Sequence, residues 1–231
     1  MTYKYKHEDK ALVAVDCIIF GFDQEEEVLK ILLIKRDFKP SKGKWSLMGG
    51  FLKTNETIDD AATRVLCTLT GLQEVYMEQL SVFSEVDRDP AERTISVAYY
   101  ALINIGDHKK DLIKKYSAQW FDLSEMPHLI FDHDLMVDHA IKRLKYRISV
   151  QPIGFELLPE KFTMRQVKKL YEAILSEELD KRNFVKKIHS MEILERLDEK
   201  DKRSSKKGSY LFRVKKDKYR RKMDKEHEFN A

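Results

Sequence analysis

The sequence predicts a mixed α/β domain followed by a smaller, basic domain of helices and a β-hairpin. Residues 1–150 combine short apolar runs of strand length with one strongly amphipathic helix. Residues 160–219 show helical periodicity twice in close succession, and two strand-like runs that flank a Lys-rich loop come next. Two prolines and a glycine in residues 151–159 mark the linker between the domains, and residues 220–231 are expected to form a charged, disordered tail.

Continuous apolar runs mark the strands of the first domain. Ala11–Phe20 is typical of a buried strand and Val28–Arg36 of its hairpin partner, with Phe22–Glu27 as the turn. Asp16 is the one charged residue in the first run, and an unpaired buried charge is unfavourable. It therefore either braces a neighbouring loop or faces a ligand cavity. Further elements are expected at residues 78–86, 93–105, 120–123 and 137–148.

The amphipathic helix is expected between Thr57 and Gly71, directly after a Gly-Gly turn at residues 49–50. Thr57 and Asp60 have the spacing of a capping box, in which each side chain bonds to a free backbone N–H at the start of the helix. Gly71 stands where a glycine ends many helices. The buried face of this helix is predicted to consist of Ile58, Ala61, Ala62, Val65, Leu66 and Leu69.

The stretch that contains this helix resembles the Nudix box, the loop–helix–loop motif of hydrolases that cleave nucleoside diphosphates linked to another group. The family pattern is G-x5-E-x7-R-E-U-x-E-E-x-G-U, where U is an aliphatic residue. The residues that match this pattern are Gly50, Glu56, Arg64, Leu66, Gly71 and Leu72. The resemblance implies a Nudix α/β/α sandwich over roughly the first 150 residues.

The chain departs from the family where three glutamates should follow the arginine, because it has Val65, Thr68 and Leu69 there. In the hydrolases those glutamates hold Mg²⁺, which requires hard oxygen ligands. The sequence therefore predicts no metal site, no catalytic residue and no cofactor, and hence no enzyme. Glu56 and Arg64 are then available to pair and brace the loop. The alternative, an active hydrolase of ADP-ribose or a related nucleoside diphosphate, would need other carboxylates beside Glu56.

Charge is distributed unevenly along the chain, although the net charge is only +4. Residues 160–231 contain 22 Lys and Arg against 14 Asp and Glu, whereas residues 1–159 contain 21 and 25. A basic second domain favours a polyanionic partner. The sequence has no apolar run of membrane-spanning length and no signal-peptide pattern, so we expect a cytoplasmic protein without a membrane partner.

The basic domain is predicted to be a winged helix. Thr163–Gln166 is a second capping box that opens one amphipathic helix, and Asp180 is placed to cap the next, Lys181–Met191. So short a connection between two helices is typical of a helix-turn-helix. Strands expected at Ile193–Leu197 and Ser209–Val214 would form the wing.

The cationic residues of this domain fall where such a fold meets DNA. Lys181, Arg182 and Asn183 occupy the first turn of the second helix, which reads base edges in the major groove. Arginine can bridge guanine and asparagine can pair with adenine. A solvated charged face or a protein-interaction module remains the alternative. The predicted DNA-binding residues are Thr163, Arg165, Gln166, Lys181, Arg182, Asn183, Lys186, Lys187, Lys202, Arg203, Lys206 and Lys207.

A degenerate Nudix box followed by a winged helix that contains Leu179–Phe184 resembles the Nudix-related transcriptional regulators of bacteria. In that family the Nudix domain senses a metabolite, either ADP-ribose or a sugar, and controls binding of the winged helix to operator DNA. The resemblance implies a ligand-responsive repressor or activator, usually a homodimer on double-stranded DNA.

The effector is expected in the former substrate pocket. Because the metal ligands are lost, we expect a small sugar, such as the pentose arabinose, before ADP-ribose. Trp45 is either a platform for that sugar or a core aromatic residue. The candidate effector-binding residues are Asp16, Arg36, Lys44, Trp45, Glu56, Arg64, Asp87 and Arg88.

Overall fold

A computed structural model describes residues 7–71, 75–106, 117–202 and 207–224. Among these residues the chain divides into two compact units. The first unit comprises the chain up to Ile19 together with Ile31–Ala101 and His108–Ala140, and the second comprises Phe20–Lys30, Leu102–Asp107 and the chain from Ile141 onward. None of the helices in the described ranges is long and apolar enough to span a membrane.

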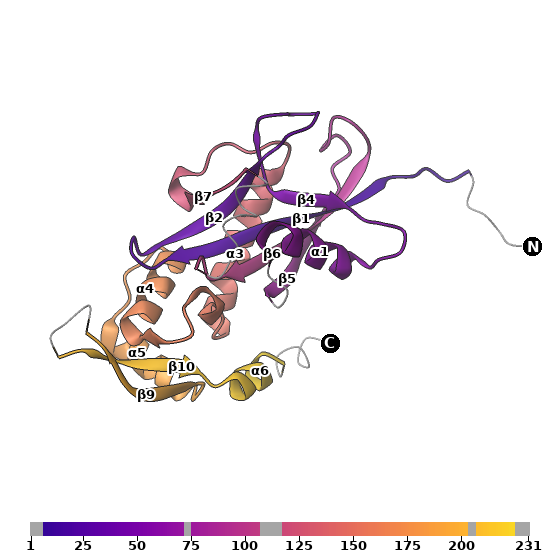
Figure 1. Ribbon diagram of the computed structural model, residues 1–231. Helices are drawn as coiled ribbons and strands as arrows, with labels where there is room; N and C mark the ends of the chain where they lie inside the picture. Colours follow the sequence, from indigo (N-terminus) through magenta and orange to yellow (C-terminus); the bar gives the residue numbers. More distant parts are fainter. Residues whose placement is uncertain (1–6, 72–74, 107–116, 203–206, 225–231) are drawn as a thin grey trace, which may run out of the picture. The chain divides into compact units, whose positions relative to one another are not determined.

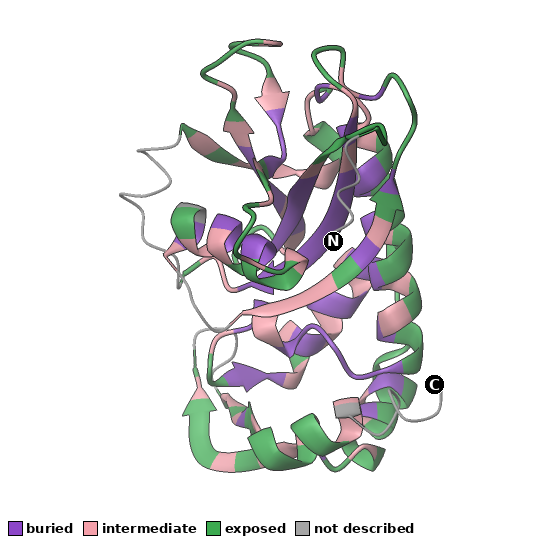
Figure 2. Cartoon of the chain, turned by 90° about the vertical axis from the view of Figure 1, so that its right-hand side faces the viewer, coloured by how far each residue is buried: buried purple, intermediate pink, exposed green. Residues whose placement is uncertain are grey.

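A seven-stranded sheet forms the centre of the Nudix-like part (Figure 1). Its main path runs β3-β2-β1-β6-β5, while β4 pairs with β1 and β7 pairs with β2. Most of the buried residues of this part lie in these strands, and buried residues are purple in Figure 2. The strands are β1 (Leu12–Asp23), β2 (Val28–Lys35), β3 (Trp45–Ser46), β4 (Met48–Phe51), β5 (Tyr76–Phe83), β6 (Thr94–Ile103) and β7 (Ala118–Asp122).

Two helices cover opposite faces of this sheet, α1 (Ile58–Thr70) and the beginning of α3 (His133–Val150) (Figures 1 and 2). The predicted capping box of α1 is present, and Gly71 ends the helix with a φ of 72°. The α/β/α sandwich expected from the sequence is therefore confirmed. A short 3₁₀ helix, η1 (Leu123–Glu125), precedes α3. Leu72, the last residue of the Nudix-box pattern, lies outside the described residues.

The two glycines at residues 49–50, which were expected to form a turn, instead lie in strand β4 and pair with β1. In this register Asp16 lies opposite Gly49. A Cβ atom on Gly49 would lie 2.2 Å from Oδ1 of Asp16 and 3.0 Å from the carbonyl oxygen of Val15. Only a glycine therefore allows the buried carboxylate of Asp16 to lie against β4.

The second unit contains the predicted winged helix. Its three-stranded sheet has the order β8-β10-β9, and α4 and α5 form the helix-turn-helix. Asp180 caps α5 by accepting a hydrogen bond from the N–H of Asn183 at 2.8 Å, as the sequence predicted. The elements are η2 (Phe155–Leu157), β8 (Phe162–Thr163), α4 (Met164–Leu175), α5 (Lys181–Ser190), β9 (Leu194–Asp201), β10 (Ser209–Val214) and α6 (Lys216–Asp224).

Three features of this unit differ from the sequence-based expectation. The strand β8 was not predicted, and β9 extends through Asp201, so Lys200 lies in a strand and not in a loop. Residues 220–224 were expected to belong to a disordered tail, but they form the end of α6. This helix is anchored because Tyr219 packs edge-on against Phe155 and donates a hydrogen bond to Glu156 at 2.8 Å.

Residues 151–159, expected to be a linker, are largely buried within the second unit. Ile153 and Leu157 have no exposed surface, and the hydroxyl of Tyr171 donates a hydrogen bond to the carbonyl of Ile153 at 3.3 Å. The two prolines and the glycine thus lie in a packed segment. The exact domain boundary stays a prediction.

Candidate effector cavity and nucleic-acid interface

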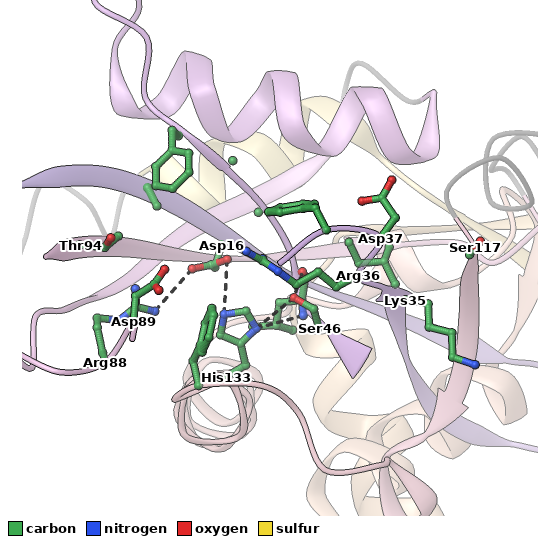
Figure 3. Close-up of a pocket in the computed structure, with 18 residues that line it drawn as sticks. Asp16, Lys35, Arg36, Asp37, Ser46, Arg88, Asp89, Thr94, Ser117 and His133 are labelled. Carbon is green, nitrogen blue, oxygen red and sulfur yellow. Dashed lines mark hydrogen bonds and ion pairs between the residues drawn. The ribbon is translucent and has the colours of Figure 1, made fainter. Parts of the chain in front are cut away.

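A cavity of about 230 Å³ opens in the first unit (Figure 3). Its walls come from β1, the end of β2, β4, the loop before β6 and the start of α3. These segments lie far apart in the sequence, and the pairing of β1 with β4 and the packing of α3 bring them together. The cavity is the candidate effector site.

Asp16 forms the charged floor of the cavity and is only 6% exposed. The hydroxyl of Ser96 donates a hydrogen bond to Asp16 Oδ2 at 2.6 Å. Arg88 Nη2 lies 3.8 Å from the same oxygen, and His133 Nε2 lies 3.8 Å from Oδ1 (Figure 3). Arg88 is fixed in turn by two hydrogen bonds to Asp132, at 2.9 and 2.7 Å. The buried carboxylate is therefore compensated by its neighbours and also faces the cavity.

His133 presents an N–H group to Asp16. The backbone N–H of Leu47 donates to His133 Nδ1 at 3.1 Å, so Nδ1 is an acceptor and the proton of the neutral ring is on Nε2. Burial lowers the pKa of His133 below its usual value, and this outweighs the opposing influence of Asp16 and Asp132. The floor thus contains a carboxylate, a guanidinium group and a neutral imidazole.

Arg36 is the second cationic group of the cavity wall. Its guanidinium carbon lies 3.8 Å from the centre of the Phe38 ring and 5.5 Å from that of Phe131. Its Nε atom is buried and has no hydrogen-bond partner among the described residues. Burial lowers the pKa of Arg36. An unsatisfied buried donor is unfavourable, which makes Arg36 a candidate for contact with a ligand oxygen.

Two aromatic rings at the cavity are strongly exposed to solvent. Phe38 is 55% exposed and Phe51 is 51% exposed, and both line the cavity. Exposed phenyl rings beside a polar floor can bind a flat or apolar part of a ligand.

The charged pair of the former Nudix box, Glu56 and Arg64, does not line the cavity. Arg64 donates to both carboxylate oxygens of Glu56, at 2.9 and 2.5 Å, and also to the carbonyl of Phe51 at 3.1 Å. The N–H of Lys53 donates to Glu56 Oε1 at 2.9 Å. These hydrogen bonds, led by that from Arg64, lower the pKa of Glu56 to about 2. Glu56 and Arg64 therefore brace the loop before α1, which was one of the two functions considered for them.

The residues of the box do not fit a magnesium ion. Val65 is buried and has no oxygen, and the hydroxyl of Thr68 already donates to the carbonyl of Arg64 at 2.7 Å. The side chain of Leu69 lies outside the described part. In the portion of the chain that the structure describes, no group of three or more His, Cys, Asp or Glu residues is placed to hold a metal ion.

Of the residues proposed from the sequence for the effector, the structure brings Asp16, Arg36 and Arg88 together. Lys44 and Asp87 are exposed and do not line the cavity. Trp45 is half-buried and does not line the cavity, and its ring packs edge-on against Phe121, with ring centres 4.8 Å apart. The sequence analysis missed the cavity residues Phe38, Ser46, Phe51, Asp89, Phe131 and His133. No local pattern distinguishes these side chains from ordinary loop or strand residues.

The exposed face of α5 carries cations without intramolecular partners. Among the described residues, the side chains of Lys181, Arg182, Lys186 and Lys187 make no hydrogen bond or ion pair. Elsewhere in the same unit cations are paired, as in Lys161–Glu199 at 2.7 Å and Arg213–Glu195 at 2.8 Å. Asn183 is exposed beside them, in the first turn of the helix. The cations of α5 are thus free to bind an external polyanion.

The start of α4 is different, although three of its residues were also predicted to contact DNA. Thr163 is only 4% exposed, and its hydroxyl accepts the N–H of Gln166 in the capping box, so burial removes it from the surface available to DNA. Arg165 Nη2 is 2.7 Å from Glu27, and the amide of Gln166 donates to Gln24 Oε1 at 2.9 Å.

The wing is formed by β9 and β10. Arg196 and Lys200 both lie over the ring of Tyr210, each 4.5 Å from its centre. Lys202 and Lys207 are exposed at the end of the hairpin. Arg203 and Lys206 lie outside the described residues, so their DNA contacts stay a prediction.

An α/β/α sandwich with a degenerate Nudix box, joined to a winged helix with an unpaired cationic helix, defines the class of Nudix-related DNA-binding regulators. The family model of the Nudix domain matches residues 10–141, and that of the NrtR DNA-binding winged helix domain matches residues 154–214. The chain therefore belongs to the Nudix family and, within it, to the NrtR group of transcriptional regulators.

The chain is similar both to a transcriptional repressor and to a hydrolase. The ADPR responsive transcriptional repressor NtrR of Acinetobacter baylyi is 30% identical over 215 residues, which cover 91% of this chain and 85% of the relative. The ADP-ribose pyrophosphatase of Methanocaldococcus jannaschii is 38% identical over 134 residues, which cover 58% of this chain and 75% of the relative.

Solved structures of Shewanella oneidensis NrtR have the same fold. In its complex with a 27mer DNA, NrtR matches with a TM-score of 0.81 at 24% identity, covering 90% of this chain and 95% of that one. The Nudix domain of the same protein, complexed with ADP ribose, matches with a TM-score of 0.51 at 28% identity. This match covers 62% of this chain and 94% of that domain's chain.

Proposed function

We propose that this protein is a transcriptional repressor that binds operator DNA through α5 and the wing, and that ADP-ribose is the effector bound in its Nudix cavity. The observation that carries the proposal is the row of unpaired cations on α5. In a helix-turn-helix, the second helix enters the major groove. Unpaired Lys and Arg side chains there can neutralise phosphates and reach base edges.

The chemistry of the cavity supports a ligand with anionic and aromatic parts. Arg36 offers an unsatisfied N–H to a phosphate oxygen, and Phe38 and Phe51 offer exposed rings to an adenine base. Asp16 accepts hydrogen bonds of the kind that ribose hydroxyls donate. All three parts occur in ADP-ribose, and the names of the Acinetobacter and Shewanella relatives agree with this ligand.

The size of the cavity limits how such a ligand would bind. Its volume of about 230 Å³ is below the ~300–1,000 Å³ typical of pockets that bury a drug-sized ligand. We therefore propose that one part of ADP-ribose enters the cavity and the remainder lies over the exposed rings. A free pentose, our expectation from the sequence, would fit by volume but would leave Arg36 without an anionic partner. The expected platform for a pentose, the ring of Trp45, packs against Phe121.

We also propose that the protein acts as a homodimer, because a two-fold symmetric protein matches a palindromic operator. Sedimentation equilibrium of the full chain, with and without a duplex, measures this directly. A monomer on a single half-site would contradict it.

The main test selects DNA from a random duplex pool and measures affinity by fluorescence anisotropy at several salt concentrations, with ADP-ribose or arabinose added. We expect sequence-selective binding that weakens as salt rises. ADP-ribose should change the affinity by a factor of about 5–150, and arabinose should not. Failure to bind any duplex at moderate salt, with or without ligand, would exclude the DNA-binding proposal.

Hydrolysis is the second candidate, since an archaeal ADP-ribose pyrophosphatase is similar over the Nudix domain. The box residues do not fit the magnesium ion that such cleavage requires, so we propose that the domain binds without cleaving. The test measures release of AMP from ADP-ribose with Mg²⁺ present. Turnover that disappears in Glu56→Gln would establish an enzyme.

A further inference from the structure

The β1–β2 hairpin belongs to both compact units. The first unit ends in β1 at Ile19 and resumes in β2 at Ile31, so the hairpin tip, Phe20–Lys30, belongs to the unit that contains the winged helix. The same strand β1 carries Asp16, the floor of the cavity. At about 3.3 Å per residue, the eight steps from Asp16 to Gln24 span about 26 Å of continuous backbone.

The hairpin tip is held in one conformation by its own side chains. Asp23 Oδ1 accepts the backbone N–H groups of Glu25 and Glu26, at 2.9 and 3.1 Å. The ammonium group of Lys30 pairs with Asp23 at 3.3 Å and also with Glu26. Glu27 has a φ of +58°, in the left-handed region that few non-glycine residues adopt. A turn fixed in this way can transmit a displacement of its strands.

The tip contacts the first helix of the helix-turn-helix through three side-chain interactions, which we call the clasp. Glu27 Oε1 accepts from Arg165 Nη2 at 2.7 Å, and Glu27 Oε2 lies 3.3 Å from Lys169 Nζ. Gln166 Nε2 donates to Gln24 Oε1 at 2.9 Å. Glu27 thus neutralises two cations that are one turn apart on α4.

The clasp is connected to the start of α4 and, through packing, to α5. The Oε1 atom of Gln166 accepts from the N–H of Thr163 at 2.8 Å, so one amide both caps α4 and bonds to the hairpin. Tyr171 of α4 packs edge-on against Phe184 of α5, with ring centres 5.2 Å apart. These contacts connect the hairpin tip, through α4, to the helix that carries the unpaired cations.

We propose that the clasp is the link through which an occupied cavity changes the DNA affinity of the winged helix. This inference rests on the proposed function and adds the path by which the cavity influences the winged helix. A ligand that engages Asp16 alters the pairing of β1, and the rigid tip passes the change to α4. The clasp is suited to this task because its ion pairs are exposed, and exposed pairs contribute little to the stability of the fold.

The test compares Glu27→Lys with the matched control Glu25→Lys. Both changes lie in the same turn and alter the net charge equally, so their general electrostatic effects on DNA binding are similar. Glu25 is exposed, and its side chain has no partner among the described residues, whereas Glu27→Lys repels Arg165 and Lys169. The coupling factor is the ratio of the DNA dissociation constants measured with and without saturating ADP-ribose.

We expect a coupling factor of about 5–150 for the wild type and for Glu25→Lys, and one below about 2 for Glu27→Lys. The affinity of Glu27→Lys for ADP-ribose, measured by calorimetry without DNA, should stay close to that of the wild type. Hydrogen exchange at the start of α4 should respond to ADP-ribose in the wild type and in the control only. A wild-type coupling factor in Glu27→Lys would overturn the clasp alone. A wild type that does not respond to ADP-ribose would overturn the proposed function, and the clasp with it.

Discussion

At the scale of single residues, the cavity depends on a glycine as much as on the side chains that line it. Gly49 lies opposite Asp16, and its missing Cβ leaves room for the carboxylate that the floor is built on. Gly49 therefore has a packing reason that the box pattern, which begins at Gly50, does not supply.

Gly49→Ala should destabilise the protein and weaken ligand binding. The new methyl group would overlap Asp16 Oδ1, and overpacking of this kind costs about 1–3 kcal/mol. Urea unfolding measures the change. Gly106→Ala is the control, because a Cβ there meets only Asn104 Oδ1, at 3.5 Å. Equal stability of the two variants would show that β4 shifts away from β1 without cost.

His133 should make stability depend on pH. Burial lowers its pKa in the folded state below the ordinary value of 6.5, so the unfolded chain binds the proton more readily. The stability that the neutral ring contributes is complete above pH 6.5 and is lost as the pH falls through the lowered pKa. His133→Asn, which retains an acceptor for Leu47, should flatten this part of the profile of unfolding free energy, whereas His7→Gln should not. An unchanged slope in His133→Asn would assign the pH dependence to another group.

At the scale of elements, the sequence was informative wherever the signal is local. The capping boxes at Thr57 and Thr163 and the cap at Asp180 set the starts of α1, α4 and α5. The strand β8 escaped notice because it has two residues and its partner in β10 is distant, with Thr163 pairing to Leu211. The helix α6 also escaped notice because it is mostly charged and depends on the packing of one side chain.

Arg182→Ala should weaken binding to the selected duplex by about 1–3 kcal/mol and relax the preference at one base pair. The reason is that Arg182 is exposed and unpaired in the first turn of α5. Competition binding against single-base variants of the site measures both effects. Lys42→Ala, an exposed cation of the first unit, is the charge-matched control. A uniform loss over all sequences would instead place Arg182 on the phosphate backbone.

At the scale of the whole molecule, the sequence identified few of the residues that line the cavity. Asp16 lies in β1 and Arg88 in the loop before β6, and the position of β6 beside β1 in the sheet brings the two together. Proximity to the box in the sequence was misleading, since Lys44 and Trp45 precede it by only a few residues yet do not line the cavity. The side of a strand that a residue faces depends on register, and register depends on partners that are distant in the sequence.

ADP-ribose at a hundredfold excess over its dissociation constant should stabilise the protein by about 2.7 kcal/mol, which corresponds to about 5–10 °C in melting temperature for a chain of this size. Arg36→Gln should reduce this shift because it removes the cation with the free Nε–H. Lys44→Gln, outside the cavity, should keep it. The measurement is the melting temperature of the wild type, Arg36→Gln and Lys44→Gln with and without ADP-ribose. Equal shifts in all three would place the phosphates away from Arg36.

The bidentate pair of Glu56 and Arg64 also bears on how the protein would behave when magnesium is scarce. Because Arg64 bonds to both carboxylate oxygens of Glu56 and holds the loop before α1, we expect the loop to keep its shape in a chelator such as EDTA. Recognition of the effector should then be indifferent to divalent cations, and a cell short of magnesium would still receive the same signal from this sensor.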